Sequence, residues 1–173
     1  MSAAVVAGSA PLTLEEFNSA DPDTARAVLG ACLDIPRWVS EVDAGRPFRD
    51  RQSLQDKAAI SADGITWAEV AGALLRHPRI GEKATGDPGD VALSAAEQSG
   101  VTDADAAEMA AGNLAYEQRF GYIYLICASG MTGEQMLAAL RQRLTNDDER
   151  ERDVVMQELR KIAALRLTKA VAA

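Results

Sequence analysis

Apolar residues recur at helical spacing through most of the chain. One run, after Asp21-Pro22, places Ala25, Val28, Leu29 and Cys32 on a single face of a helix that should end before Pro36. The other runs with the same i, i+3, i+4 spacing are Trp67, Val70, Ala71, Leu74 and Leu75; Ala106, Met109, Ala110, Asn113 and Leu114; Met136, Leu137, Leu140 and Leu144; and Val154, Val155, Leu159, Ile162 and Leu165. The pattern predicts an all-α protein.

Capping residues stand where these helices should begin. A hydroxyl or carboxylate followed three residues later by Glu or Gln satisfies the first free N–H groups of a helix reciprocally, and proline is favoured at the first helical position. The predicted starts are Thr13-Leu14-Glu15-Glu16, Asp21-Pro22, Ser53 to Asp56, Thr66-Trp67-Ala68-Glu69, Thr102, Thr132 to Gln135, and Asn146 or Asp147.

Two stretches depart from this pattern. The run FGYIYLICASG at 120–130 contains β-branched and aromatic residues that would suit a strand, but a lone strand has no partner, so we expect a buried helix. Residues 79–92 (RIGEKATGDPGDVA) predict a loop, because Pro78 disfavours the α conformation at His77. A loop of about fourteen residues is longer than most connections, and such loops are usually functional or disordered.

Length and composition favour one domain in a reducing compartment. A chain of 173 residues suits a single core, and 5% aromatic residues favour packed helices. We expect a flexible segment over 1–11 and a single-domain multi-helix bundle over 12–170. The net charge of −8 argues against nucleic acid. Cys32 and Cys127 predict reduced thiols, and the lack of a signal peptide or of about 18 consecutive apolar residues predicts a cytoplasmic protein without membrane spans.

His77 is the only histidine of the chain and stands where a helix must stop. One interpretation is structural, since an imidazolium at a helix C-terminus interacts favourably with the helix dipole. The other is general acid–base catalysis, because an imidazole with a pKa of about 6.5 transfers protons readily near neutral pH. The residues alone leave both open.

Other candidate chemistry is sparse. Ser94-Ala95-Ala96-Glu97-Gln98 contains S-x-x-E, which can be a helix cap or part of a site. One histidine and two distant cysteines cannot supply a usual zinc site, and there is no nucleotide-binding or serine-hydrolase motif. The pairs Arg141/Arg143 and Arg150/Arg152 flank acidic residues, so we expect them on solvated helix faces.

Five segments in order resemble one enzyme family. They are HPRIG (77–81), SAAEQSG (94–100), NLAYEQRFGYIYLICASG (113–130), RQRLTND (141–147) and KIAALRL (161–167). Together they resemble the 2-oxo-4-hydroxy-4-carboxy-5-ureidoimidazoline (OHCU) decarboxylases, bacterial branch, and LTLEEFNSAD (12–21) and RPF (46–48) fit its N-terminal region. Ile123 stands where many members have proline.

The resemblance implies a fold, a reaction and a site. It implies an all-helical, typically homodimeric carboxy-lyase that uses no metal or organic cofactor and converts OHCU to (S)-allantoin in urate degradation. It further implies that His77 is the catalytic acid. The substrate pocket would be lined by Pro78, by Ser94, Ala95, Ala96, Glu97 and Gln98, and by the backbone of Tyr124, Leu125, Ile126, Cys127 and Ala128.

The chemistry admits several roles for these groups. His77 would deliver the proton that sets the S configuration, or first remove the substrate hydroxyl proton. Glu97 would orient the imidazole, hold the ureido N–H groups, or destabilise the substrate carboxylate. Gln98 and the backbone N–H groups of 124–128 would bind the ring carbonyl where charge develops. For Arg119 and Arg166 two interpretations remain: each either binds the substrate carboxylate or forms a salt bridge. The alternatives in function are a non-catalytic helical protein-interaction module and an enzyme acting on a related ureide.

Overall fold

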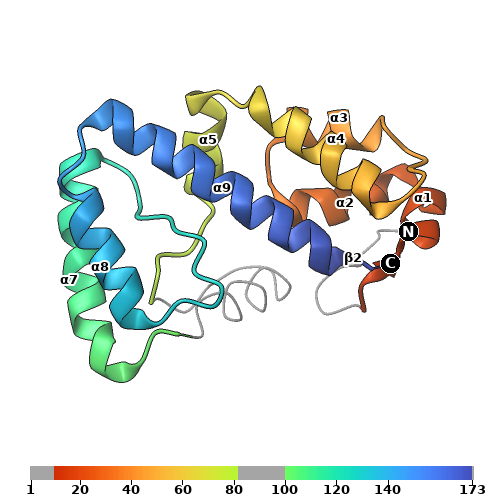
Figure 1. The fold of residues 1–173 in the computed structure, drawn as a ribbon. Coiled ribbons are helices and arrows are strands. Elements are labelled where there is room, and N and C mark those ends of the chain that lie inside the picture. Colours follow the sequence, from red (N-terminus) through yellow and green to blue (C-terminus); the bar gives the residue numbers. More distant parts are fainter. Residues whose placement is uncertain (1–9, 82–99, 173) are drawn as a thin grey trace. The chain divides into compact units, whose positions relative to one another are not determined.

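The computed structural model describes residues 10–81 and 100–172, and these are mostly helical (Figure 1). Their contacts divide into two compact units, one holding the chain up to Ala73 and from Arg160 onward, the other holding Leu74–Leu159. The expected all-α fold is confirmed, while the domain bounds 12–170 stay a prediction and most of the 1–11 segment lies outside the described residues. The elements are β1 (Leu12–Thr13), α1 (Leu14–Ser19), α2 (Pro22–Cys32), α3 (Pro36–Asp43), α4 (Arg51–Asp63), α5 (Trp67–Leu74), α7 (Asp103–Phe120), α8 (Gly133–Arg143), α9 (Asp148–Ala170) and β2 (Val171–Ala172).

Local capping accounts for most helix starts. The Thr13 hydroxyl accepts the Glu16 N–H at 3.2 Å, and the Glu16 carboxylate accepts the Thr13 N–H at 2.7 Å. The same reciprocal arrangement joins Thr132 to Gln135 at the start of α8. Asp147 accepts the Arg150 N–H at 2.8 Å at the start of α9. These helices begin where the sequence predicts because their caps need only neighbouring residues.

The first unit holds the chain up to Ala73 and from Arg160 onward. Within it, α3 packs against both α2 and α4. Its first and last described strands, β1 and β2, pair in parallel, with Leu12 opposite Val171. Trp38 is buried in the core and its indole Nε1 donates to the carbonyl of Ala58 at 2.9 Å. Arg46, from the RPF segment, donates to carbonyls that end α1, including those of Phe17 at 2.8 Å and Ala20 at 2.9 Å.

In the second unit, residues 74–159, α7 packs against α8. A Cβ added at Gly112 of α7 would lie 2.3 Å from Cδ2 of Leu140 on α8, so any larger residue here would require the Leu140 side chain to shift. One apolar cluster fills the unit, and its buried members are Ile80, Met109, Tyr116, Tyr124, Ile126, Ala128, Met136, Leu137 and Leu140. The cluster joins Ile80, three residues after His77, to Tyr124, Ile126 and Ala128.

The expected helix over 120–130 is wrong. Helix α7 ends at Phe120, and residues 121–130 form neither a helix nor a strand. Gly121 adopts a left-handed conformation, φ +80°, and its N–H donates to the carbonyl of Glu117 at 2.8 Å, which is a typical glycine helix end. Tyr124, Leu125, Ile126 and Ala128 are buried here without regular structure, and Arg143 and Glu158 bind backbone groups of Leu125 and Cys127.

Two further boundaries differ from expectation. Helix α3 was not predicted, although Pro36 at its first position is a helix-start signal. Helix α4 begins at Arg51 and not at Ser53, because the Asp50 carboxylate accepts the Ser53 N–H at 2.7 Å and caps the helix earlier.

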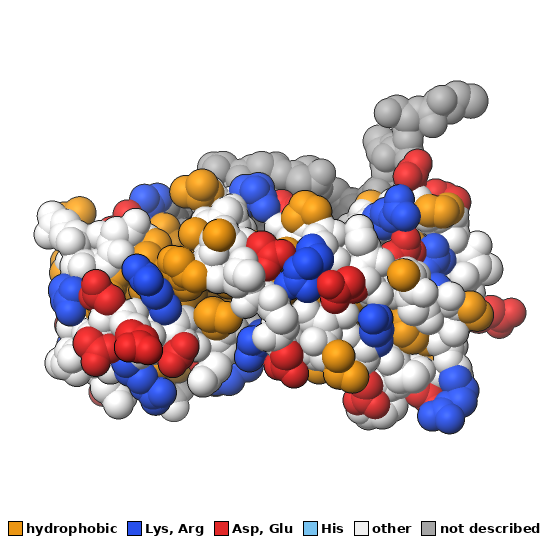
Figure 2. Space-filling model, turned by 90° about the horizontal axis from the view of Figure 1, so that it is seen from above, with side chains coloured by type: hydrophobic (Ala, Val, Ile, Leu, Met, Phe, Trp, Pro, Cys, Tyr) orange, Lys and Arg blue, Asp and Glu red, His pale blue; other side chains and the backbone are white. Residues whose placement is uncertain are grey.

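Surface charge in the described residues is mixed. On the face shown in Figure 2, Lys and Arg side chains lie beside Asp and Glu side chains and do not gather into a separate basic field. In residues 10–81 and 100–172, no helix combines the length and apolar character that crossing a bilayer requires.

Candidate active site

His77 and Pro78 follow directly on a helix end. Helix α5 stops at Leu74, three residues earlier than the sequence suggested, and a turn follows in which the His77 N–H donates to the Leu74 carbonyl at 3.2 Å. Both His77 and Pro78 are half-buried. The backbone on the N-terminal side of the imidazole is therefore held by a hydrogen bond.

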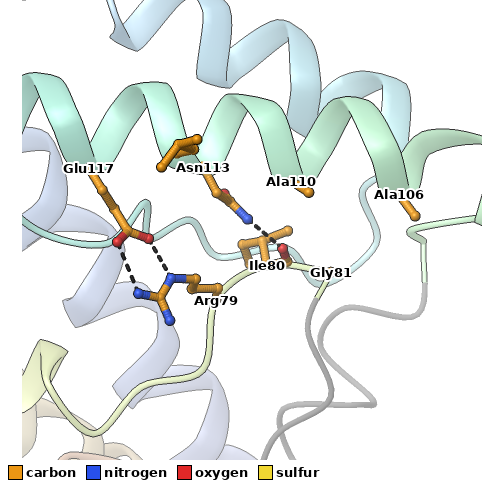
Figure 3. A pocket seen from close by; sticks show the side chains of 8 residues that line it. Arg79, Ile80, Gly81, Ala106, Ala110, Asn113 and Glu117 are labelled. Carbon is orange, nitrogen blue, oxygen red and sulfur yellow. Dashed lines mark hydrogen bonds and ion pairs between the residues drawn. The ribbon is translucent and has the colours of Figure 1, made fainter.

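The residues after Pro78 rest on α7. The Arg79 guanidinium binds both carboxylate oxygens of Glu117, with Nε–Oε1 at 2.5 Å and a second contact at 2.9 Å (Figure 3). Asn113, which is buried, donates from Nδ2 to the Ile80 carbonyl at 2.8 Å. The hydrogen bond from Arg79 keeps the pKa of Glu117 below its usual range, so this carboxyl is ionised at neutral pH.

A cavity of about 220 Å³ lies between this stretch and α7. Its walls combine the Arg79–Glu117 ion pair with small apolar side chains (Figure 3). The lining residues are Arg79, Ile80, Gly81, Ala106, Ala110, Asn113, Leu114 and Glu117.

Segment 124–128, the second part of the predicted pocket, is bound through its backbone by two charged side chains. Arg143 of α8 donates to the Leu125 carbonyl at 2.6 Å, and Glu158 of α9 accepts the Cys127 N–H at 2.8 Å. Within the described residues, the N–H groups of Ile126 and Ala128 donate to no acceptor. The four side chains other than that of Cys127 are buried, so the segment presents mainly backbone groups for binding.

A buried ionic network lies behind this segment. Arg143 Nε donates to Glu151 Oε1 at 2.7 Å, and the Tyr116 hydroxyl donates to the same oxygen. The expectation that Arg143 lies on a solvated face is therefore wrong, since its side chain is 8% exposed. Burial first, and the hydrogen bond to Glu151 second, raise the pKa of Tyr116 far above its usual value, so its hydroxyl stays protonated and donates.

The stretch that follows His77 and Pro78 shares one hydrophobic core with the segment 124–128. Ile80, which follows His77-Pro78-Arg79, lies in the same apolar cluster as Tyr124, Ile126 and Ala128. The rings of Tyr116 on α7 and Tyr124 pack edge to face with centroids 5.3 Å apart. Helix α7 thus supports both the stretch 79–81 and the segment 124–128. The third part, Ser94, Ala95, Ala96, Glu97 and Gln98, lies outside the described residues.

Sequence reasoning missed the side chains that hold these two segments. They are Arg79, Asn113, Glu117, Arg143, Glu151 and Glu158. Apart from Glu151 and Glu158 they belong to segments that carry the family resemblance, which was the available signal, but their partners are distant in sequence.

The remaining polar candidates make the following contacts within the described residues. Arg119 forms an exposed ion pair with Asp148 at 2.8 Å, which favours the salt-bridge interpretation for this arginine. Arg166, in the other unit, is buried and donates to the carbonyl of Ala31 at 3.3 Å. No cluster of His, Cys, Asp and Glu able to hold a metal occurs among the described residues.

Comparisons with known proteins agree with the resemblance. The family model described as OHCU decarboxylase matches residues 18–168. An OHCU decarboxylase of Amia calva is 33% identical over 161 residues, which cover 90% of this chain and 88% of that protein. The uric acid degradation bifunctional protein TTL of Arabidopsis thaliana is 31% identical over 80% of this chain and 44% of its own length.

The fold is shared with solved structures. A crystal structure of an OHCU decarboxylase in the presence of (S)-allantoin matches with a TM-score of 0.68 at 23% identity, covering 87% of this chain and 97% of that one. A crystal structure of an (S)-allantoin synthase matches with a TM-score of 0.69 at 18% identity, covering 94% of this chain and 54% of that one. With a family match across nearly its whole length and relatives above 30% identity, the chain belongs to the OHCU decarboxylase family of carboxy-lyases.

Proposed function

We propose that this chain decarboxylates OHCU to (S)-allantoin in urate degradation, with His77 as the proton donor. The observation that carries the proposal is the position of the chain's one histidine. His77 lies in a turn that is closed by its N–H bond to the Leu74 carbonyl, and the next residues, 79–81, are bound to α7. The chain around it matches the family over residues 18–168. A proton donor has to be held in a defined direction to deliver its proton to one face of a planar intermediate.

The reaction needs one proton delivered at one carbon. The bond between C4 and the carboxylate breaks, CO₂ leaves, and the electron pair of that bond enters the ring. The C4 hydroxyl becomes the carbonyl of allantoin by losing its proton, and C5, which carries the ureido group, gains a proton and becomes the stereocentre. Delivery by His77 from a single face makes only the S product. No metal or organic cofactor takes part in this scheme.

The segment 124–128 would stabilise the charge that develops on the ring oxygen. Arg143 and Glu158 already bind the Leu125 carbonyl and the Cys127 N–H, whereas the N–H groups of Ile126 and Ala128 have no acceptor in the described residues. We assign the role of oxyanion donors to these two N–H groups. Preorganised donors of this kind are typically worth about 10²–10³ in kcat.

The remaining predicted groups complete the proposed site. Pro78 would line it beside His77, and Ser94, Ala95, Ala96 and Gln98 would contact substrate. Glu97 would orient the imidazole or bind the ureido N–H groups. A homodimer and a cytoplasmic location stay predictions.

The test is optical detection of the product. OHCU is generated in situ from urate by urate oxidase and hydroxyisourate hydrolase, and allantoin formation is followed by circular dichroism with wild type and His77→Asn. We expect wild type to form (S)-allantoin rapidly. We expect His77→Asn, folded by far-ultraviolet circular dichroism, to lose at least about 2 kcal/mol of transition-state stabilisation, since general acid catalysis contributes about 10²–10⁴-fold.

Two other outcomes would overturn parts of the proposal. Slow, racemic product with wild type would exclude OHCU decarboxylation and favour an interaction module or an enzyme for a related ureide. Equal rates for wild type and His77→Asn would keep the reaction but exclude His77 as proton donor.

A further inference from the structure

Three consecutive residues after Pro78 contact α7 at positions four residues apart. Arg79 pairs with Glu117 and the Ile80 carbonyl accepts from Asn113 (Figure 3). A Cβ built on Gly81 would contact Met109. Residues four apart lie on one face of a helix, so the stretch 79–81 follows a single stripe of α7.

The contact at Gly81 is close. Gly81 has φ +83°, and a Cβ built on it would lie 3.3 Å from Cγ of Met109. A side chain at this position would be strained by the backbone conformation and would press on α7. The backbone at Gly81 is therefore held close to α7, which restricts the backbone conformations open to Arg79 and Ile80.

His77 is separated from this anchored stretch by one residue. Its own N–H is bonded to the Leu74 carbonyl, and Pro78, whose ring fixes φ, is the only residue between His77 and Arg79. Because Pro78 has a fixed φ, fewer backbone torsions lie between Arg79 and His77 to absorb a rotation of the Arg79 peptide before it reaches His77. The ion pair sits at the start of the anchored stretch, where such a rotation would begin.

We propose that Arg79 and Glu117 are positioning residues that set the direction of the His77 imidazole during proton delivery. The inference rests on the proposed function for its catalytic consequence. A bidentate guanidinium–carboxylate pair defines orientation as well as distance, which a single contact does not. The Arg79 and Glu117 side chains are 43% and 25% exposed, so the pair is placed for geometry more than for the stability of a buried core.

The chain offers a matched control on the same helix. Glu108 of α7 pairs with Arg141 of α8, and both side chains are more than half exposed. Glu108→Gln and Glu117→Gln therefore remove the same charge from the same helix, and each breaks one arginine pair. Of these two carboxylates, Glu117 pairs with the stretch that follows His77, whereas Glu108 pairs with α8.

The experiment uses the full chain and its single histidine. In a ¹H–¹³C NMR spectrum the His77 imidazole gives the only histidine signal, so its position and width report directly on this side chain. We expect Glu117→Gln to shift or broaden the signal, to lower kcat about ten- to a hundredfold, as about 1 Å of misplacement can, with a smaller change in KM, and to release partly racemic allantoin. Glu108→Gln should match wild type in all of these.

Arg79→Lys is the second variant. It keeps the charge but loses the bidentate geometry, and it should shift the His77 signal in the same direction; it decides the question if Glu117→Gln does not fold. An unchanged imidazole signal and unchanged kcat and enantiomeric excess in the folded variants would overturn the inference. If wild type makes no (S)-allantoin, the proposed function fails, and the NMR comparison of the Glu117 and Glu108 variants still decides whether the pair positions His77.

Discussion

Arg143 and Glu151 form an ion pair that is almost completely removed from solvent, with side chains 8% and 0% exposed. The pair joins the end of α8 to the first turn of α9, and Arg143 extends from it to the Leu125 carbonyl. Asn146 Nδ2 donates to the second Glu151 oxygen at 2.8 Å, so both carboxylate oxygens accept hydrogen bonds. The segment proposed to bind substrate is therefore held by a buried charge pair.

Breaking this pair should be costly. Glu151→Ala leaves Arg143 buried without its counter-charge, and we expect a loss of about 3–5 kcal/mol in the free energy of unfolding, measured by urea titration. Asp148→Ala, which breaks the exposed pair with Arg119, should cost less than about 1 kcal/mol. Similar losses for the two variants would contradict the view that the Arg143–Glu151 pair supports the core.

The contact between Glu158 and Cys127 should affect substrate binding. Glu158→Ala removes the acceptor of the Cys127 N–H and loosens 124–128, and we expect KM to rise by about tenfold, the loss of roughly one hydrogen bond to a charged group. Glu158→Gln keeps an acceptor oxygen and should change KM less. Asp153→Ala, an exposed substitution on the same helix, is the control, and a KM for Glu158→Ala equal to that of this control would count against the role.

Two glycines should respond to alanine with opposite signs. Gly30 lies inside α2 and an added Cβ meets nothing within 4 Å, so Gly30→Ala should stabilise the chain by about 0.5–1 kcal/mol. Gly121 also has open space, but its φ is +80°, and Gly121→Ala should destabilise by about 1–2 kcal/mol. Thermal unfolding of both variants measures the difference, and a stabilised Gly121→Ala would show that α7 does not need its left-handed end.

Acid should weaken the unit that contains α5. Hydrogen bonds from Arg37 and from the Thr66 N–H lower the pKa of Glu69 to about 2. Because the folded pKa lies below the unfolded value of about 4.3, this carboxyl stabilises the fold fully above about pH 5, and the contribution is lost as pH falls through 4 toward 2. The Tm difference between wild type and Glu69→Gln should shrink over that range. Glu15→Gln, an exposed substitution in the same unit, is the control.

Local interactions explain what could be predicted from the sequence. The caps Thr13–Glu16 and Thr132–Gln135 involve residues three apart, so a pattern of side chains is enough to locate α1 and α8. His77 could be selected because it is the only imidazole and because Pro78 ends the helical pattern. The family resemblance then gave both a role.

Long-range contacts explain what could not. Residues 121–130 look helical or strand-like by composition, and their irregular path depends on Arg143 and Glu158, which come from α8 and α9. Arg143 looks like a surface residue beside acidic neighbours, and only the folded chain shows that Glu151 and Tyr116 bury it. Arg143 and Glu151 are eight residues apart on different helices, and Arg143 and Tyr116 are 27 residues apart, so no local pattern indicates these contacts.

The pairing of β1 with β2 has a consequence for folding during synthesis. Core residues Ile162, Leu167 and Val171 belong to the same unit as Phe17 and Trp38, yet they leave the ribosome only after the whole of residues 74–159. Part of the apolar surface of the first 73 residues therefore stays uncovered until residues 160–173 have been synthesised. The unit of residues 74–159 is complete before that point and can fold first. The order of folding in the growing chain would then be the reverse of the usual N-terminal-first order.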